Sequence, residues 1–310
     1  MNALVGYTGF VGSNLFASGS FELGFNSKNI QDAYGLKPDL LVYAGLRAEK
    51  YLANNFPEKD FALIEEAERN MERICPQRLV LISTVDVYKD PVEVDEDTEI
   101  ATDGLHAYGY NRFLLEEWVR EHDPNALIVR LPGLFGKNLK KNFIYDYIHR
   151  IPFMLKENKF LEFSAGFPEL GEYYEKLDNG FYRCRKLNSE EESSAKKIFR
   201  QLGFSALVFT DSRSIFQFYP LNRLWNDIQT ALSAGLELWN PATEPVSAAE
   251  LYRYLSGRDF TNEISDRPAR YDYRTKYAEY FGGKDGYIMS KRQVLEAIRE
   301  FVEKETEGKN

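Results

Sequence analysis

A chain of 310 residues with 44% hydrophobic and 15% aromatic residues can form a sizeable core, which excludes extensive disorder. The formal net charge of −9 argues against a general nucleic-acid-binding protein, which needs a basic face to neutralise phosphates, but it leaves room for a local basic pocket. Two cysteines without a CxxC spacing and three scattered histidines predict neither a disulfide framework nor a metal site.

The first half of the chain alternates short apolar runs with helical patterns. The apolar runs predict strands at 2–6, 21–26, 39–45, 78–84 and 126–131. The stretches between them predict helices at 60–74 and 108–122. Strands that are apolar on both faces and separated by helices indicate a parallel sheet covered on both sides. The sequence therefore predicts an α/β fold with a doubly wound parallel sheet of the Rossmann type.

The second half of the chain has a less regular pattern of apolar and polar residues. Residues 153–213 are aromatic, charged and irregular, and we interpret them as an insertion with its own strands and one helix near 190–202. Capping boxes at 247–250 and 290–293 predict two later helices. We predict a dinucleotide-binding domain from residues 1–150 with a returning segment, 214–240. Residues 151–213 and 241–310 would form a smaller C-terminal substrate-binding subdomain.

The start of the chain has no basic region followed by an apolar run, as a signal peptide would have. No stretch has the length and hydrophobicity needed to span a bilayer. We therefore expect a soluble cytoplasmic protein.

A glycine-rich stretch, GYTGFVG, follows the first predicted strand and opens a helix. It places Gly6, Gly9 and Gly12 at GxxGxxG spacing, with Thr8, Phe10 and Val11 between them. Glycines here allow a tight turn and a close approach of backbone to a pyrophosphate at the positive end of a helix. Tight strand-to-helix turns also use glycine for purely structural reasons, but this context meets the conditions of the motif. We predict that these six residues bind a nucleotide.

The residues after the second predicted strand bear on the choice of cofactor. An acidic residue there would bind the adenosine ribose of NAD, but the chain has Asn26, Ser27 and Lys28 instead. A hydroxyl and an ammonium suit a 2′-phosphate, so NADP(H) is slightly favoured and NAD(H) is the alternative. An ordinary exposed loop lysine would explain Lys28 equally simply.

Several motifs along the chain together resemble the extended short-chain dehydrogenases/reductases, a family of nucleotide-sugar epimerases, dehydratases and reductases. The matching pieces are GYTGFVG (6–12), LVYAG (41–45), ISTVDVY (82–88), DEDTE (95–99), YGYNR (108–112), VRLPGLFG (129–136), FQFYPLNRLWNDI (216–228) and LWNPATEPVSAAELYRYL (238–255). They span most of the chain, although the insertion at 153–213 matches nothing in the family.

The resemblance implies an active site. In this family a Ser or Thr at the end of a strand binds the reacting sugar oxygen, and Thr84 has that position. A tyrosine is the general acid/base, and Tyr108 matches it. The resemblance also brings Ala44, Gly45 and Pro132 to the cofactor.

The chain departs from the family four residues after Tyr108. The family has a lysine there that binds the nicotinamide ribose and lowers the pKa of the tyrosine, whereas this chain has Arg112. An arginine supplies a permanent positive charge, but its planar fork places hydrogen-bond donors differently from a compact ammonium. Three outcomes stay open: a working site with arginine, a slower one, and a cofactor-binding site without chemistry.

Other residues have two interpretations each. Asp86 has the position at which the dehydratases of the family carry a proton-abstracting glutamate, and it could equally hydrogen-bond a loop backbone. Arg267, Arg270 and Arg274 could bind the diphosphate of a substrate or be ordinary surface arginines.

The resemblance thus implies an NAD(P)-dependent oxidoreductase, epimerase or dehydratase acting on a nucleotide-activated sugar, with catalytic Thr84, Tyr108, Arg112 and Asp86. It also implies a possible homodimer through the helix at 108–122. The alternative is a non-catalytic NADP(H)-binding sensor or scaffold protein with a degenerate site.

Overall fold

The computed structural model describes residues 1–307, and the chain divides into two compact units. The first unit contains Met1–Asn138, Ile215–Val246 and Arg270–Val294, and the second contains Leu139–Ser214, Ser247–Ala269 and the residues from Leu295 onward. The first unit therefore includes 241–246 and 270–294, which the sequence analysis assigns to the substrate-binding subdomain.

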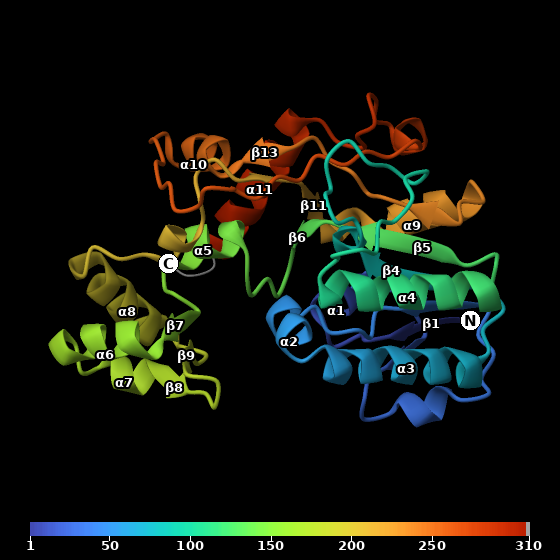
Figure 1. Ribbon diagram of the computed structural model, residues 1–310, viewed down its shortest axis with the longest axis horizontal. Helices are drawn as coiled ribbons and strands as arrows, with labels where there is room; N and C mark the ends of the chain where they lie inside the picture. The colour runs from blue at the N-terminus through green and yellow to red at the C-terminus, as the bar shows by residue number, and fades with distance from the viewer. Residues whose placement is uncertain (308–310) are drawn as a thin grey trace. The chain divides into compact units, whose positions relative to one another are not determined.

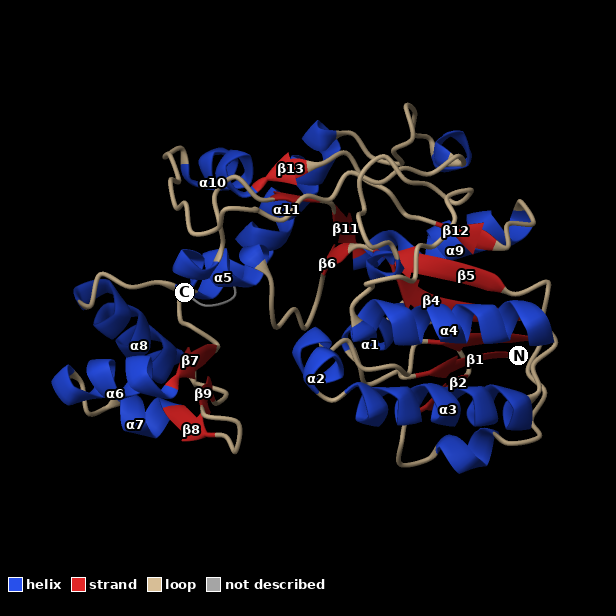
Figure 2. Ribbon diagram, in the orientation of Figure 1, coloured by secondary structure: helices blue, strands red, loops and turns tan. Residues whose placement is uncertain are grey.

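The first unit is built on a six-stranded sheet (Figures 1 and 2). Its strands, in spatial order, are β2 (Leu23–Phe25), β1 (Asn2–Val5), β3 (Leu40–Tyr43), β4 (Leu79–Thr84), β5 (Leu127–Leu131) and β12 (Leu238–Trp239). Every neighbouring pair is parallel. The predicted doubly wound parallel sheet is confirmed.

Both faces of this sheet are buried, which explains why its strands are continuously apolar. On one face, α3 (Pro57–Ile74) and α4 (Ala107–His122) lie side by side over the strands (Figure 1). The core on this side contains Ala3, Val5, Leu41, Tyr43, Leu81, Ile64, Ala67, Met71, Leu115 and Val119. The strand residues in this set alternate along each strand, as a pleated sheet requires.

The helices of this unit agree with the sequence analysis in part. The predicted helix at 60–74 begins earlier, because Pro57 suits the first helical position and Glu58 and Asp60 suit the positive end. The predicted helix at 108–122 is α4. Short helix α2 (Lys50–Asn55) was missed. The unit also contains α1 (Phe10–Phe16), α9 (Leu224–Ser233) and a parallel pair formed by β6 (Gly133–Phe135) and β11 (Phe218–Pro220).

The second unit has its own antiparallel sheet, in the order β7 (Met154–Lys156), β9 (Phe181–Cys184) and β8 (Tyr174–Lys176). The predicted helix near 190–202 is α8 (Ser189–Gln201), which begins with a capping box between Asn188 and Glu191. The sequence analysis missed α6 (Glu157–Gly166) and α7 (Leu170–Tyr173). An aromatic core around Phe160, Phe163 and Phe199 holds these elements together.

The other helices and strands are short or terminal. They are α5 (Phe143–His149), β10 (Ile215–Phe216), β13 (Val246–Ser247), α10 (Ala248–Ser256) and α11 (Lys291–Glu307). The predicted capping box at the start of α10 is present, between Ser247 and Glu250. Across residues 1–307 every helix is too short or too polar to cross a membrane.

Candidate active site

The order of the strands locates the place where a ligand fits this sheet. The chain moves from β1 outward to β2 and then returns to β3 on the other side of β1. In open α/β sheets, ligands bind outside the carboxyl ends of the strands at such a reversal point. The loops after Val5, Tyr43 and Thr84 lie along this edge.

The glycine loop after β1 is packed tightly against its neighbours. Gly6 has a φ of +90°, and a Cβ added there would lie 2.3 Å from the carbonyl oxygen of Ala44. A Cβ on Gly12 would lie 2.1 Å from the carbonyl oxygen of Gly6. These two glycines are therefore required by the turn itself, and they bring the end of β1 against Ala44 and Gly45.

Gly9 differs from these two glycines because it is exposed and forms the N-cap of α1. No side chain of the described chain caps this helix end. The backbone N–H groups of the first helical turn, at Phe10 and Val11, therefore lack the oxygen that a capping side chain would supply.

The end of β2 lies beside this loop, since the Gly6 N–H donates to the Phe25 carbonyl at 2.7 Å. Directly after β2, the side chain of Asn26 accepts from the Lys28 N–H at 2.9 Å, which forms a tight turn. This turn leaves Ser27 and Lys28 exposed.

The start of α4 fixes the position of Tyr108. His106 caps the helix by accepting from the Gly109 N–H at 3.0 Å. Gly109 packs so closely on the turn after β4 that an added Cβ would lie 2.1 Å from the Asp86 carbonyl oxygen. Glycine at this position allows the Tyr108 end of the helix to lie against the loop that follows Thr84.

Tyr108 is buried, and the polar groups of the site converge on it. Burial raises the pKa of its phenol above the ordinary value, and this is the largest influence. The Arg112 guanidinium lowers that pKa, the Asp86 carboxylate raises it, and the Lys50 ammonium and the nearby Thr84 hydroxyl lower it. The structure therefore brings Thr84, Asp86 and Arg112 close to Tyr108.

Arg112 lies across the face of the Tyr108 ring, with its Cζ 4.3 Å from the ring centroid. Its Nη1 pairs with Asp60 of α3, and its Nη2 donates to the Arg47 carbonyl at 2.7 Å. Only 3% of this side chain is exposed. The guanidinium is thus committed to partners within the protein.

A second cation, Lys50, reaches the site from α2. Its Nζ lies 2.6 Å from Asp86 Oδ1, 3.4 Å from the Tyr271 hydroxyl and 5.9 Å from the centroid of the Tyr108 ring. The Tyr271 hydroxyl in turn donates to Asp86 Oδ1 at 3.2 Å. Burial lowers the pKa of Lys50, but Asp86 and Tyr271 more than offset this, so the pKa is raised.

The sequence analysis missed Lys50, Asp60 and Tyr271. Lys50 had one usable signal: it comes soon after the carboxyl end of β3, and ligands bind at the carboxyl ends of such strands. Asp60 and Tyr271 have no comparable signal, because only the packing of distant segments brings them to the site.

No family model and no curated protein matches the sequence of this chain. Solved structures do match it. A dTDP-4-dehydrorhamnose reductase from Bacillus anthracis in complex with NADP superposes with a TM-score of 0.61 at 14% identity, covering 97% of this chain and 96% of that one. A dTDP-4-dehydrorhamnose reductase from Yersinia enterocolitica gives 0.63 at 13% identity, with 97% and 98% covered. The Bordetella bronchiseptica enzyme WbmG in complex with NAD and UDP gives 0.61 at 15% identity, with 98% and 94% covered.

The chain has the fold of these solved enzymes, which agrees with the resemblance found in its sequence. The likeness extends over nearly the whole chain and therefore includes the insertion at 153–213, which matched no motif of the family.

Within this fold, the segment after β5 runs from Pro132 through β6 back toward α1. The side chain of Asn14 donates to the Lys137 carbonyl at 2.8 Å, and that of Asn138 donates to Ser13 Oγ at 3.2 Å. These bonds tie the end of the VRLPGLFG motif to the helix that follows the glycine loop.

The three arginines considered for a diphosphate have different surroundings. Arg274 pairs with Asp272 and covers the ring of Tyr287, with its Cζ 4.1 Å from the centroid. Arg270 is exposed in the first unit, and Arg267 is exposed in the second. Arg267 therefore belongs to a different unit from Arg270 and Arg274.

A buried polar cluster lies on the same strand and helix as the candidate site. Glu116 of α4 accepts from Ser83 Oγ at 2.5 Å and pairs with Arg130 of β5 at 2.6 Å. Arg130 also donates to the Tyr88 hydroxyl at 2.8 Å. We call Ser83, Tyr88, Glu116 and Arg130 the closed cluster.

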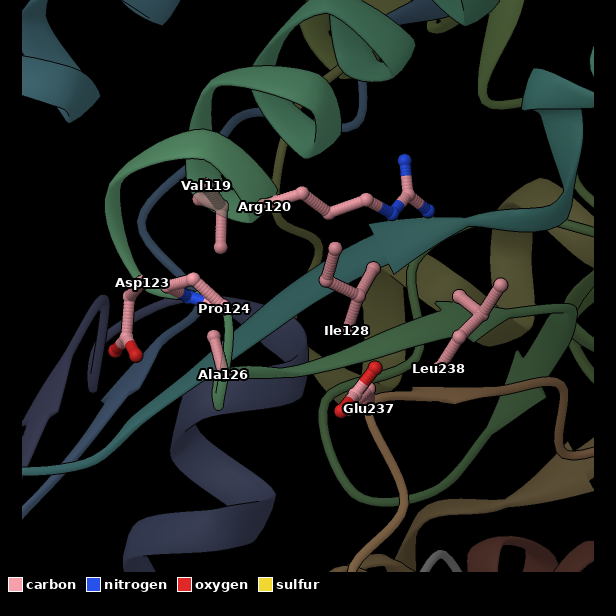
Figure 3. Close-up of a pocket in the computed structure, with 8 residues that line it drawn as sticks. All are labelled: Val119, Arg120, Asp123, Pro124, Ala126, Ile128, Glu237 and Leu238. Carbon is pink, nitrogen blue, oxygen red and sulfur yellow. The ribbon is translucent and has the colours of Figure 1, made fainter.

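A hollow at the C-terminal end of α4 is lined by no residue of the candidate site or of the closed cluster (Figure 3). It is lined by Val119, Arg120, Asp123, Pro124, Ala126, Ile128, Glu237 and Leu238. Ala126 precedes β5, so the hollow lies toward the amino end of that strand, away from Thr84 and Tyr108.

Proposed function

We propose that this protein is an NAD(P)-dependent enzyme that acts on a nucleotide-activated sugar by hydride transfer, with Tyr108 as general acid/base. The observation that carries the proposal is the convergence of Thr84 and Tyr108 at the carboxyl edge of the sheet. A strand-end hydroxyl beside a buried phenol, on the same edge as a glycine loop, is the arrangement that this chemistry needs.

The chain's own residues fit a dinucleotide. The exposed Gly9 and the uncapped N–H groups at Phe10 and Val11 could receive a pyrophosphate, with Thr8 beside them. Gly6 and Gly12 hold this loop in shape.

The other proposed cofactor contacts lie on the same edge: Ala44 and Gly45 after β3, and Pro132 after β5. When bound, the nicotinamide would accept or donate the hydride. The exposed Ser27 and Lys28, beside Asn26, suit the 2′-phosphate of NADP(H), which we prefer slightly over NAD(H).

Tyr108 and Thr84 would act on one oxygen of the sugar. Thr84 binds that oxygen by a hydrogen bond, and the Tyr108 hydroxyl gives it a proton or takes one from it. Burial alone would leave the phenol too weak an acid, because its pKa is raised. The nearby positive charges of Arg112 and Lys50 counteract part of this effect.

The structural neighbours support the class of substrate. Their names include a nucleotide sugar in dTDP-4-dehydrorhamnose reductase and a bound nucleotide in the complex of WbmG with UDP. Both NADP and NAD occur among them, so they favour neither cofactor.

Asp86 would contribute in one of two ways. Its contacts with Lys50 and Tyr271 favour a role in holding Lys50. Proton abstraction of the dehydratase type would require the carboxylate to exchange these partners for the substrate.

Substitution of Tyr108 tests the proposal. We expect Tyr108→Phe to lower turnover of UDP-, GDP- or dTDP-sugars by roughly 100- to 10,000-fold, because it removes the proton that the sugar oxygen exchanges. The affinity for NADPH, measured by fluorescence titration, should change less than about threefold, since the ring and its packing remain.

Tyr110→Phe is the matched control, because Tyr110 lies on the same helix and is 40% exposed. We expect it to keep wild-type turnover. Wild-type turnover by Tyr108→Phe would contradict the proposed role of Tyr108.

The burial of Arg112 favours one alternative, a sensor or scaffold protein that binds NADP(H) without chemistry. A guanidinium committed to Asp60 and Arg47 cannot bind a ribose as the family's lysine does. Saturable binding of NADPH without turnover of any nucleotide sugar would support this alternative.

A homodimer through α4 is a further part of the proposal. Leu114 and Trp118 are only partly buried on this helix, while Leu115 and Val119 face the core. Sedimentation of wild type and a Leu114→Glu/Trp118→Glu variant tests it. We expect a dimer for the first and a monomer for the second.

A further inference from the structure

The lysine missing at position 112 has a candidate replacement elsewhere in the chain. The side chain of Lys50 is 43% exposed, whereas that of Arg112 is 3% exposed. A group must have accessible surface to bind a ligand, so only Lys50 of these two cations can do so in the observed arrangement.

The short helix α2 is attached to the start of α4 at both ends. The side chain of Asn54 accepts from the Tyr108 N–H at 2.9 Å. Before the helix begins, the Arg47 carbonyl accepts from Arg112 Nη2 at 2.7 Å. Lys50 and Asn54 are four residues apart and therefore lie on the same face of α2. These two bonds direct Lys50 toward Tyr108.

Lys50 also keeps hydrogen-bonding capacity for a ligand. An ammonium has three N–H donors. Among the described residues, the Lys50 ammonium has two acceptors, Asp86 and the Tyr271 hydroxyl. One donor therefore stays available on a partly exposed cation beside Tyr108.

We propose that Lys50 takes over one task of the absent lysine, as the ammonium that binds the nicotinamide ribose, and that Arg112 is the anchor that positions α2. This inference rests on the proposed function. The Arg112 anchor includes its pairing with Asp60, which also accepts from the Asn111 side chain at 2.9 Å. Arg112 is thus a positioning residue.

Binding measurements on wild type and variants test this role of Lys50 without any sugar substrate. Adenosine 2′,5′-bisphosphate contains only the adenosine half of NADPH. We expect Lys50→Met to weaken NADPH binding about tenfold or more, the value of one charge-assisted hydrogen bond, and to leave binding of the bisphosphate unchanged. Lys28→Met should weaken both ligands to a similar degree, because it acts at the 2′-phosphate.

Two further variants separate the role of Lys50 from general damage. Lys50→Arg keeps the positive charge but places its donors differently, so it should bind NADPH more tightly than Lys50→Met and more weakly than wild type. Lys59→Met removes an exposed lysine next to the Phe56 ring, outside the site, and should bind both ligands as wild type does.

The pH profile gives a second readout. The charged or titratable groups around Tyr108 are Lys50, Asp86, His106, Arg112 and Tyr271. Lys50→Met removes a cation that lowers the pKa of Tyr108 and leaves Asp86, which raises it. In the pH dependence of turnover, the apparent pKa that belongs to Tyr108 should therefore move to higher pH.

The outcomes distinguish this inference from the proposed function. Wild-type protein that neither binds NADPH nor turns over a nucleotide sugar would overturn both. Wild-type protein that does both, together with a Lys50→Met variant of unchanged NADPH affinity and pH profile, would overturn the role of Lys50 alone.

Discussion

Ser83 and Thr84 are neighbours on β4, but they belong to two polar clusters of opposite character. Ser83 belongs to the closed cluster, in which Glu116 is fully buried and its carboxylate binds Ser83 and Arg130. Thr84 belongs to what we call the open cluster: Lys50, Thr84, Asp86, Tyr108 and Tyr271.

The difference shows how one strand and one helix can serve both stability and chemistry. Buried charges are tolerated when all their partners lie within the protein, and such a network holds its elements in one arrangement. The open cluster ends in a partly exposed ammonium with a spare donor. We therefore expect changes in the closed cluster to affect folding, and changes in the open cluster to affect ligands.

The largest effect should come from Glu116→Gln, which leaves Arg130 buried without its counter-charge. We expect a loss of about 3–5 kcal/mol in the free energy of unfolding, measured by urea denaturation. Glu117→Gln is the control, because Glu117 is 55% exposed and pairs only at the surface. Its effect should stay below about 1 kcal/mol. Equal effects of the two substitutions would contradict the comparison.

Gly109→Ala should have the second-largest effect, because it changes the junction between α4 and the loop of the open cluster. The added methyl group would meet the Asp86 carbonyl oxygen at 2.1 Å and force the helix start away from it. We expect a destabilisation of about 1–3 kcal/mol and a loss of turnover. Gly166→Ala in α6 is the control, because an added Cβ there meets nothing within 4 Å. Wild-type turnover by Gly109→Ala would show that the close packing is not needed.

The two neighbouring hydroxyls should show the most limited effects, because each substitution changes stability or turnover but not both. Ser83→Ala removes a donor to Glu116 and should cost about 1–3 kcal/mol of stability without changing the affinity for NADPH. Thr84→Val should change stability by less than about 1.5 kcal/mol but lower turnover roughly 10- to 100-fold, because the sugar oxygen loses one bond. Urea denaturation and steady-state kinetics on the pair measure this. The opposite pattern would mean that the clusters were assigned the wrong way round.

The sequence predicted the features that depend on local patterns of residues. The glycine loop, Thr84 and Tyr108 each lie on a strand end or a helix start, and the apolar runs around them show where those elements are. The parallel sheet followed from the same runs, because strands buried on both faces are apolar throughout.

The rest depends on contacts between distant segments. Helix α2 has six residues, too few for a recognisable period, so Lys50 and Asn54 could not be placed. The pairing of Arg112 with Asp60 depends on how α3 packs on α4, which no local pattern records. The sequence alone therefore suggested Arg112 as the ribose-binding cation, whereas we propose Lys50 for that role because Arg112 is buried and paired with Asp60.

A crystal structure of the protein soaked with NADP(H) tests the central claim most directly. We expect the pyrophosphate against the N–H groups after Gly9, and the nicotinamide ring beside the hydroxyls of Thr84 and Tyr108. A dinucleotide bound elsewhere, or a Tyr108 hydroxyl that points away from the nicotinamide, would contradict the account.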